Sequence, residues 1–426
     1  MKYTLFLITI FFVKLNAQSP YFPPTNNSTW DTISPNRLGW CEDSIQSLYD
    51  FLELKNTKSF IVLKDGKIVI EKYFGTFTKD SNWYWASAGK TLTSALVGVA
   101  HSEKTLHIFD STSKYLGVGW TSCTPQQEGK IKILHQLTMS TGLDEDVPDE
   151  NCIAPSCLKY KAVPNTRWYY HNAPYRLLQD VVANASGTTF QLYTRNKIGN
   201  KIGMGGLWYD YIYYSKARDM ARFGLLASNG FIWNNDTIIK DRNYVVNSVN
   251  TSQSMNYSYG YLWWLNGKSS FMAPSSSIVF NGMLAPKAPS DMYSALGKND
   301  QKIYIVPSQK LVVIRQGNDA GQATLGPSSF DNDVWDRISR LSCNSTSVKM
   351  VSNTNRVLSS NPFTDKIQVE LNSNEVAVLY NSMGAEIYRG DKINEQNFSD
   401  LGTGVYHLII YNELTGSKVF FKQIKY

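Results

Sequence analysis

Strand patterns lie near both ends of the larger part of this chain, and a mostly helical stretch separates them. Ser59–Phe74 contains two β-branched runs that flank Asp65-Gly66, a strong short-range signal for a β-hairpin. Three more strand patterns follow much later, at 293–297, 302–306 and 311–315. We therefore expect an α+β fold, with one antiparallel sheet that the two ends complete and a helical subdomain inserted between them.

Apolar spacing and capping residues locate the expected helices. They predict helices at 43–54, 131–143, 173–185, 215–230 and 330–341, and a further strand at 259–265. We expect Ser215 to cap the fourth helix and Asn229-Gly230 to end it. A cleft where a helical subdomain meets a sheet is a favoured ligand site.

A helix pattern of small and apolar residues without proline begins at Ser87 and runs to Ala100. Lys90 follows Ser87 by three residues, so on a helix its amine lies beside the hydroxyl. A serine needs a base to act as a nucleophile near neutral pH, and burial lowers the pKa of a lysine toward that range. Ser and Lys meet at this spacing by chance in many long chains, so other segments have to support the motif.

A second group of polar residues stands at Tyr170-His171-Asn172. Tyr170 and Asn172 are two apart, so both side chains point to the same side of an extended segment. A phenol near a cationic lysine loses its proton more easily, so we expect Tyr170 to take a proton from Ser87 or pass it to a leaving group. Asn172 can accept a hydrogen bond from Lys90 and donate one to a substrate carbonyl.

Two neighbouring residues offer alternatives to this reading. Tyr169 leaves the choice of tyrosine open. His171 suggests a Ser/His pair, but the chain has no Gly-x-Ser-x-Gly motif and His171 would point away from its neighbours' side. We therefore predict a structural role for His171.

Together, Ser87-x-x-Lys90 and Tyr170-x-Asn172 resemble the motifs of the serine β-lactamase and penicillin-binding-protein superfamily. The similarity is greatest to its branch of class C β-lactamases, D-alanyl-D-alanine carboxypeptidases, esterases and 6-aminohexanoate-dimer hydrolases, and it covers about 40–342. The hairpin and four later segments also resemble that branch: 134–143, 217–224, 259–264 and 303–307. The resemblance implies a β-lactamase/transpeptidase-like fold, no cofactor, an acylated Ser87, and Lys90 and Tyr170 as its proton-transfer partners.

The resemblance also implies where a substrate binds. Asn172 would contact the substrate, and the N–H of Ser87 with one near Gly297-Lys298 would form the oxyanion hole. The family's third motif is Lys-Thr-Gly or His-Thr-Gly, whereas this chain has Ala295-Leu296-Gly297. Because the missing cation helps to hold a carboxylate in the family, its loss favours an ester or amide without that group. Lys298 is a candidate to replace it.

The composition is that of a globular chain with a leader. Of its 426 residues 42% are hydrophobic and 18% charged, and the net charge of +7 is scattered along the sequence. A nucleic-acid-binding protein would concentrate its basic residues, so we expect no such partner. Residues 1–17 predict a secretory signal peptide, with Met1-Lys2 before an apolar run and small residues before Gln18.

Five cysteines in an exported chain suggest disulfides. Cys152 and Cys157 close a short loop and are the first candidate pair. Cys41 and Cys343 flank the main domain and are the second candidate pair, so Cys123 has no predicted disulfide partner. The five histidines form no His/Cys cluster at ligand spacing, so we predict no metal site.

The C-terminal part reads as a small β-sandwich after a polar linker. We expect the hydrolase domain to span 18–345, the linker 346–357 and the sandwich 358–426. The segments 360–363, 378–384 and 401–406 resemble a type A sorting domain of type IX secretion. That resemblance implies secretion machinery as a partner and a secreted or cell-surface location. The alternative for this part is a carbohydrate-binding or adhesive module.

These features together predict a secreted serine hydrolase that acts on a small-molecule or peptide acyl substrate. One alternative is a catalytically idle peptide- or peptidoglycan-binding module on the same fold. Another is a D-amino-acid peptidase or a β-lactamase proper. The sequence leaves the substrate and the oligomeric state open.

Overall fold

The structure, a computed structural model, describes residues 20–321, 326–343, 356–414 and 418–426. The predicted signal peptide and most of the predicted linker lie outside these residues. The chain divides into two compact units, Met1–Ser342 and Cys343–Tyr426, and each is described by itself.

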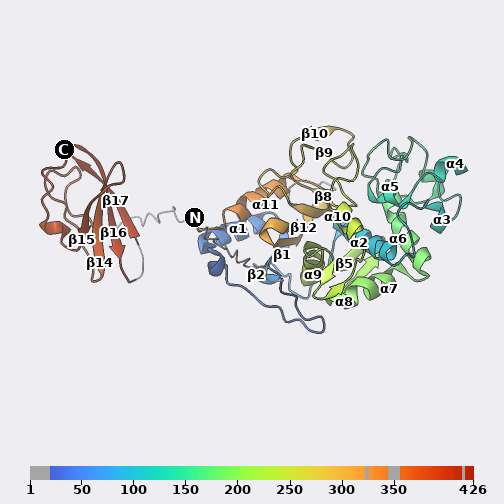
Figure 1. The fold of residues 1–426 in the computed structure, drawn as a ribbon, viewed down its shortest axis with the longest axis horizontal. Helices are drawn as coiled ribbons and strands as arrows, with labels where there is room; N and C mark the ends of the chain where they lie inside the picture. Colours follow the sequence, from blue (N-terminus) through green and yellow to red (C-terminus); the bar gives the residue numbers. More distant parts are fainter. Residues whose placement is uncertain (1–19, 322–325, 344–355, 415–417) are drawn as a thin grey trace, which may run out of the picture. The chain divides into compact units, whose positions relative to one another are not determined.

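The larger unit is built on a six-stranded antiparallel sheet that both ends of the unit complete, as predicted (Figure 1). The hairpin strand β1 pairs with β13 near the end of the unit, and Ile61 lies opposite Ile314. In order across the sheet, the strands are β2 (Lys67–Tyr73), β1 (Thr57–Lys64), β13 (Leu311–Gly317), β12 (Gln301–Val306), β11 (Tyr293–Gly297) and β8 (Trp264–Leu265). The hairpin turn has positive φ at Asp65 and Gly66, as a tight two-residue turn requires.

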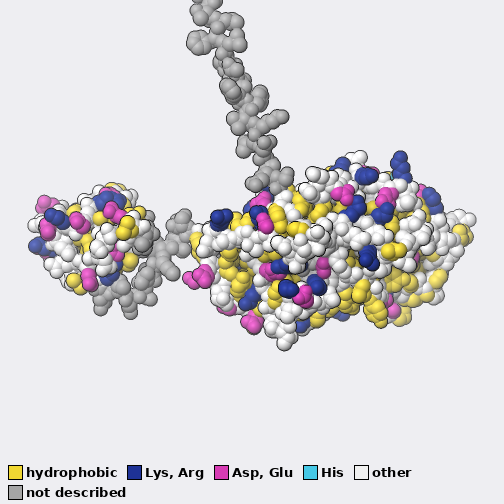
Figure 2. Space-filling view, turned by 90° about the horizontal axis from the view of Figure 1, so that it is seen from below, with side chains coloured by type: hydrophobic (Ala, Val, Ile, Leu, Met, Phe, Trp, Pro, Cys, Tyr) yellow, Lys and Arg dark blue, Asp and Glu magenta, His cyan; other side chains and the backbone are white. Residues whose placement is uncertain are grey.

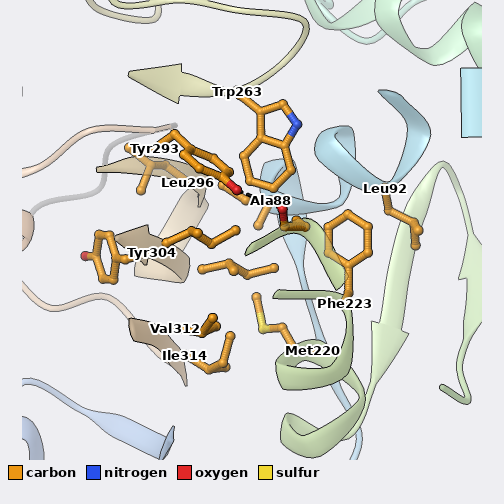
Figure 3. Packing of buried hydrophobic residues seen from close by; sticks show 14 of the residues in the cluster. Ala88, Leu92, Met220, Phe223, Trp263, Tyr293, Leu296, Tyr304, Val312 and Ile314 are labelled. Carbon is orange, nitrogen blue, oxygen red and sulfur yellow. Dashed lines mark hydrogen bonds between the residues drawn. The ribbon is translucent and has the colours of Figure 1, made fainter. Parts of the chain in front are cut away.

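Helices cover both faces of this sheet. On one face α9 (Ala217–Ser228) comes so close that a Cβ at Gly224 would lie 2.6 Å from Val312. Figure 3 shows Met220 of α9 near Val312 and Ile314 of the sheet, and Phe223 of α9 near Ala88 in the turn that carries the predicted nucleophile. The other face packs on α11 (Ser329–Ser339) and α1 (Glu42–Leu54), with the Tyr304 and Trp335 rings 5.7 Å apart.

The inserted part is mostly helical, and its helices gather away from β1 and β2 (Figure 1). Its longest helices, α2 and α6, pack on one another. The elements are α2 (Lys90–Ser102), α3 (Ser113–Leu116), α4 (Pro125–Glu128), α5 (Ile133–Leu137), α6 (Asn172–Ser186), α7 (Phe190–Thr194), a π-helical turn (Arg195–Gly199), α8 (Asn200–Ile202) and α10 (Arg242–Ser248).

Short strands and 3-10 turns connect these layers. The short strands form the three-stranded sheet β3 (Trp83–Tyr84), β5 (Ile212–Ser215) and β4 (Leu207–Tyr209), and the pairs β6 (Ile232–Trp233) with β7 (Asp236–Thr237) and β9 (Ser270–Met272) with β10 (Val279–Asn281). The 3-10 turns of this unit are η1 (Pro35–Leu38), η2 (Ala86–Gly89), η3 (Pro155–Cys157), η5 (Lys298–Asp300) and η6 (Pro307–Gln309).

The predicted helix at 131–143 is wrong in its second half, because α5 ends at Leu137. Thr138 turns its hydroxyl back onto the Leu134 carbonyl at 2.9 Å and also contacts the Ser140 hydroxyl at 2.7 Å. Met139 then has a positive φ of 57°, and its carbonyl accepts a hydrogen bond from the backbone of Tyr169. Contacts with a distant segment therefore end the helix early.

The predicted strand at 259–265 is also mostly wrong, since only Trp264 and Leu265 belong to the sheet. Leu262 has a φ of 64° and reverses the chain, so that Tyr259 pairs with Trp264. The N–H of Leu262 donates to Leu137 instead of to a strand. The apolar pattern here reflects burial of a turn.

The helix predicted at 215–230 begins later than expected. Ser215 ends β5 and accepts a hydrogen bond from the Trp85 indole at 2.8 Å, while Lys216 is the N-cap of α9. The prediction of Ser215 as a cap is therefore wrong. The end of the helix is as predicted, with Asn229 as C-cap and a left-handed Gly230.

The cysteines fall into the predicted groups. Cys152 is bonded to Cys157, and Cys41 and Cys343 are disulfide-bonded as well. Cys123 is the free cysteine of the described residues. A backbone bridge between Trp40 and Ser342 brings the two ends of the larger unit together.

The smaller unit is all-β, as predicted. Its four-stranded sheet runs β15 (Glu386–Gly390), β14 (Glu375–Asn381), β16 (Gly404–Asn412) and β17 (Lys418–Lys425), next to the 3-10 turn η7 (Ile393–Glu395). The alternating apolar and polar residues at 366–370 form no strand, only a single bridge between Val369 and Val357. The sorting role of this unit stays a prediction.

The surface of the larger unit mixes charges of both signs. On the face in Figure 2, Lys and Arg side chains are interspersed with Asp and Glu. Among the described residues, no helix has the length and apolar character needed to span a membrane.

Candidate active site

Ser87 lies in η2, the tight turn between β3 and α2. The turn is held from one side by β5, where the Trp85 N–H donates to the Tyr213 carbonyl at 2.8 Å. The Trp85 ring packs against Phe223 of α9, with 5.7 Å between centroids. Ala86 has a φ of 46°, a conformation that costs free energy for a residue with a side chain and that these contacts maintain. The strained turn presents Ser87, which is half-buried, at the surface of a pocket.

Lys90 begins α2 and has the geometry that the Ser-x-x-Lys spacing predicted. Its Nζ lies 3.0 Å from Ser87 Oγ and 2.9 Å from Asn172 Oδ1. The side chain is buried, at 3% exposure. Burial lowers the pKa of Lys90 to about 7, the nearby Arg176 cation lowers it as well, and Glu150 opposes this. A large fraction of this amine is therefore neutral near pH 7.

Tyr170 lies beside this pair, but its acidity is opposite to the prediction. Burial raises the pKa of Tyr170 above its usual value, and the Ser87 side chain only opposes that rise. The prediction of an easily lost proton required a cationic Lys90, whereas burial favours the neutral amine. Lys90 Nζ lies 4.9 Å from the centroid of the Tyr170 ring, and Trp264 stacks on that ring. Tyr170 thus keeps its proton at neutral pH.

Asn172 is the first residue of α6, and its side chain has a partner on each side. Its Oδ1 accepts from Lys90, and its Nδ2 donates to Glu150 Oε1 at 3.0 Å. His171, the residue before it, is buried, and burial lowers its pKa to about 4. Both of its ring nitrogens lack a hydrogen-bond partner among the described residues.

Gly297 ends β11 directly against the Ser87 turn. A Cβ at this position would lie 2.5 Å from the Trp85 carbonyl oxygen and 3.1 Å from the Ser87 nitrogen. The absence of a side chain therefore lets the strand approach the nucleophile's own N–H. Ala295, at the place of the missing cation, is fully buried.

Four of the six predicted catalytic and substrate-binding residues line a cavity of about 200 Å³, whereas Tyr170 and Gly297 do not. Its lining includes Ser87, Lys90, Asn172 and Lys298, so the exposed Lys298 faces the same space as the nucleophile. A larger cavity of about 700 Å³ lies beside α11 and contains none of the predicted site residues.

Four further residues line the cavity that contains Ser87 and were not predicted from the sequence: Glu150, Tyr175, Arg176 and Tyr211. Helical spacing could have revealed two of them, because Tyr175 and Arg176 follow Asn172 by three and four residues on α6. Glu150 and Tyr211 come from loops that carry no motif.

Comparison with known proteins gives this arrangement a family. The family model described as "Beta-lactamase" matches residues 57–329. The chain belongs to the β-lactamase family. This is a family of serine hydrolases, and Ser87, Lys90, Tyr170 and Asn172 all lie within the matched range.

Solved structures of several proteins share the fold. A putative 6-aminohexanoate-dimer hydrolase from Bacillus anthracis is 17% identical, with a TM-score of 0.57 over 75% of this chain and 88% of that one. A putative β-lactamase from Bacteroides dorei is 15% identical, with a TM-score of 0.55 over 71% and 99%. A penicillin-binding-protein homologue from Caulobacter crescentus is 12% identical, with a TM-score of 0.55 over 71% and 98%. No curated protein matches.

Proposed function

We propose that the chain hydrolyses an ester or amide through an acyl-enzyme on Ser87. The observation that carries this proposal is the 3.0 Å contact between Ser87 Oγ and the buried amine of Lys90. A lysine with a pKa of about 7 can accept a proton at neutral pH, which an exposed lysine cannot. The fold of the β-lactamase family supports the same class of reaction.

In the proposed first step, neutral Lys90 accepts the hydroxyl proton while Ser87 Oγ bonds to the substrate's carbonyl carbon. The oxyanion that forms is stabilised by the Ser87 N–H and by a backbone N–H near Gly297, which the close contact of β11 with the turn supports. The leaving alcohol or amine departs with the proton that Lys90 took from Ser87, either directly or by way of Tyr170, which gives its own proton and recovers the one from Lys90. Lys90 therefore ends the step neutral and Tyr170 ends it protonated. Since Tyr170 is protonated, it acts as a donor and Lys90 acts as the base.

In the second step, water attacks the acyl-serine ester and releases the acid. Lys90 again takes a proton, here from the water, and Ser87 recovers its hydroxyl. The overall reaction consumes one water and yields one acid and one alcohol or amine.

The pocket supports a small acyl substrate. Its volume of about 200 Å³ holds a short chain, and Ala295 offers no cation for the carboxylate of a β-lactam. Lys298 and Arg176 lie elsewhere on the lining and would favour a substrate with a negative or carbonyl-rich group at the rim. One structural relative is titled a putative 6-aminohexanoate-dimer hydrolase, so short amino-acid dimers belong among the substrates to test.

The direct test is turnover of p-nitrophenyl acetate and a panel of esters, amides, D-amino-acid peptides and β-lactams. Ser87→Ala should abolish turnover of every accepted substrate, while the folded state stays intact. Substrate binding without turnover by the native chain would instead favour the idle binding module. Equal turnover by Ser87→Ala would exclude Ser87 as the nucleophile.

A further inference from the structure

Glu150 lies in a loop that carries no sequence motif, and it contacts Asn172 of the candidate active site. Its Oε1 accepts a hydrogen bond from Asn172 Nδ2 at 3.0 Å. Its backbone carbonyl accepts the N–H of Ala173 at 3.1 Å, which fixes the loop on the first turn of α6. The side chain is half-buried and lines the same cavity as Ser87.

The contact selects one of the two orientations of the Asn172 amide. An amide presents an oxygen on one side and N–H groups on the other, and rotation by half a turn exchanges them. An ionised carboxylate only accepts, so Glu150 pairs with the Nδ2 side. The Oδ1 side is then left for Lys90 Nζ, which lies 2.9 Å away. Without Glu150, the amide could turn its donors toward the amine.

The loop is tied close to Glu150. Cys152, two residues on, is disulfide-bonded to Cys157. The Cys152 N–H donates to the Asp149 carbonyl at 3.1 Å, and the Asp149 side chain accepts from the Asn151 N–H at 2.9 Å. These constraints lower the entropy that Glu150 loses when it contacts Asn172.

We propose that Glu150 is a positioning residue that orients the Asn172 amide, and through it the Lys90 amine, for attack by Ser87. This inference rests on the proposed function, because it assigns a role within the same reaction. It adds a residue that none of the sequence motifs contains. Its basis is a chain of three hydrogen bonds: Glu150 to Asn172, Asn172 to Lys90, and Lys90 to Ser87.

Two variants of almost equal size separate hydrogen bonding from bulk. Glu150→Gln keeps an acceptor oxygen in reach of Asn172, whereas Glu150→Met does not. For p-nitrophenyl acetate we expect kcat within about threefold of the native value in E150Q and a fall of about tenfold or more in E150M. Because Glu150 raises the pKa of Lys90, both variants should move the acid limb of the pH–rate profile to lower pH. Asp146→Ala is the matched control, since Asp146 is an exposed acid in the same loop.

A third variant keeps the result decisive if Glu150→Met does not fold. Glu150→Asp retains the charge but shortens the reach by one methylene, so kcat should fall while the acid limb stays in place. Equal kcat in the Gln, Met and Asp variants would overturn the positioning role. An equally low kcat in E150Q and E150M would also overturn it, because the charge of Glu150 and not its hydrogen bond to Asn172 would then determine the rate. Fluorophosphonate labelling of Ser87 in the native chain keeps the two questions apart: absence of labelling there contradicts the proposed function itself.

Discussion

Gly297→Ala tests whether strand β11 has to meet the nucleophile's turn at the observed distance. The new Cβ would lie 2.5 Å from the Trp85 carbonyl oxygen and 2.9 Å from the Ala88 nitrogen, and real Cβ contacts essentially never fall below 3.0 Å. Both neighbours are backbone atoms, so no side-chain rotation relieves the clash. The strand and the turn must therefore separate by about half an ångström or more.

Such a separation would act on rate and on stability. A displacement of this size in the oxyanion donors should lower kcat/KM by about tenfold to a hundredfold. Overpacking should also lower the free energy of unfolding by about 1–3 kcal/mol. The assays are steady-state turnover of p-nitrophenyl acetate and chemical denaturation. Gly205→Ala is the control, because the nearest atoms to its Cβ are 3.8 Å away. Native kcat/KM in Gly297→Ala would refute this reading of the contact.

The remaining predictions concern pH. With Lys90 as the base and its pKa at about 7, kcat/KM should fall as the pH drops through 7. The Lys90→Arg variant should lose turnover, because an arginine side chain cannot deprotonate. An acid limb of the pH–rate profile above pH 9 would contradict the assignment of Lys90 as the base. Burial lowers the pKa of both His171 and His135 from 6.5 to about 4, so the unfolded chain binds more protons between these values and stability should fall as the pH drops from 6.5 to 4. Each histidine contributes up to about 3 kcal/mol to that loss, so His171→Leu should make the pH dependence in denaturation curves shallower; an unchanged slope would contradict the buried neutral state.

The sequence predicted the parts of the fold that local chemistry determines. The Asp65-Gly66 turn requires positive φ at both residues and has it, and the three-residue spacing from Ser87 in η2 to Lys90 at the start of α2 sets their contact. The reversals at Met139 and Leu262 could not be predicted, because neither residue favours positive φ. Tertiary hydrogen bonds to Tyr169 and Leu137 stabilise them.

The candidate active site likewise contains residues that sequence motifs predicted and features that depend on the folded structure. Ser87, Lys90, Tyr170 and Asn172 carry motifs, and the structure brings them together. The acidity of Tyr170 was predicted wrongly, because the effect of burial on both partners depends on packing that a motif does not contain. Glu150 was not predicted from the sequence, because only the folding of its loop onto α6 brings it to Asn172.

The central claim is that Ser87 becomes covalently acylated, and intact-protein mass spectrometry tests it most directly. A fluorophosphonate probe should add one adduct to the native chain, and peptide mapping should place it on Ser87. The Ser87→Ala variant should gain no mass under the same conditions. An adduct on another residue, or equal labelling of Ser87→Ala, would contradict the account.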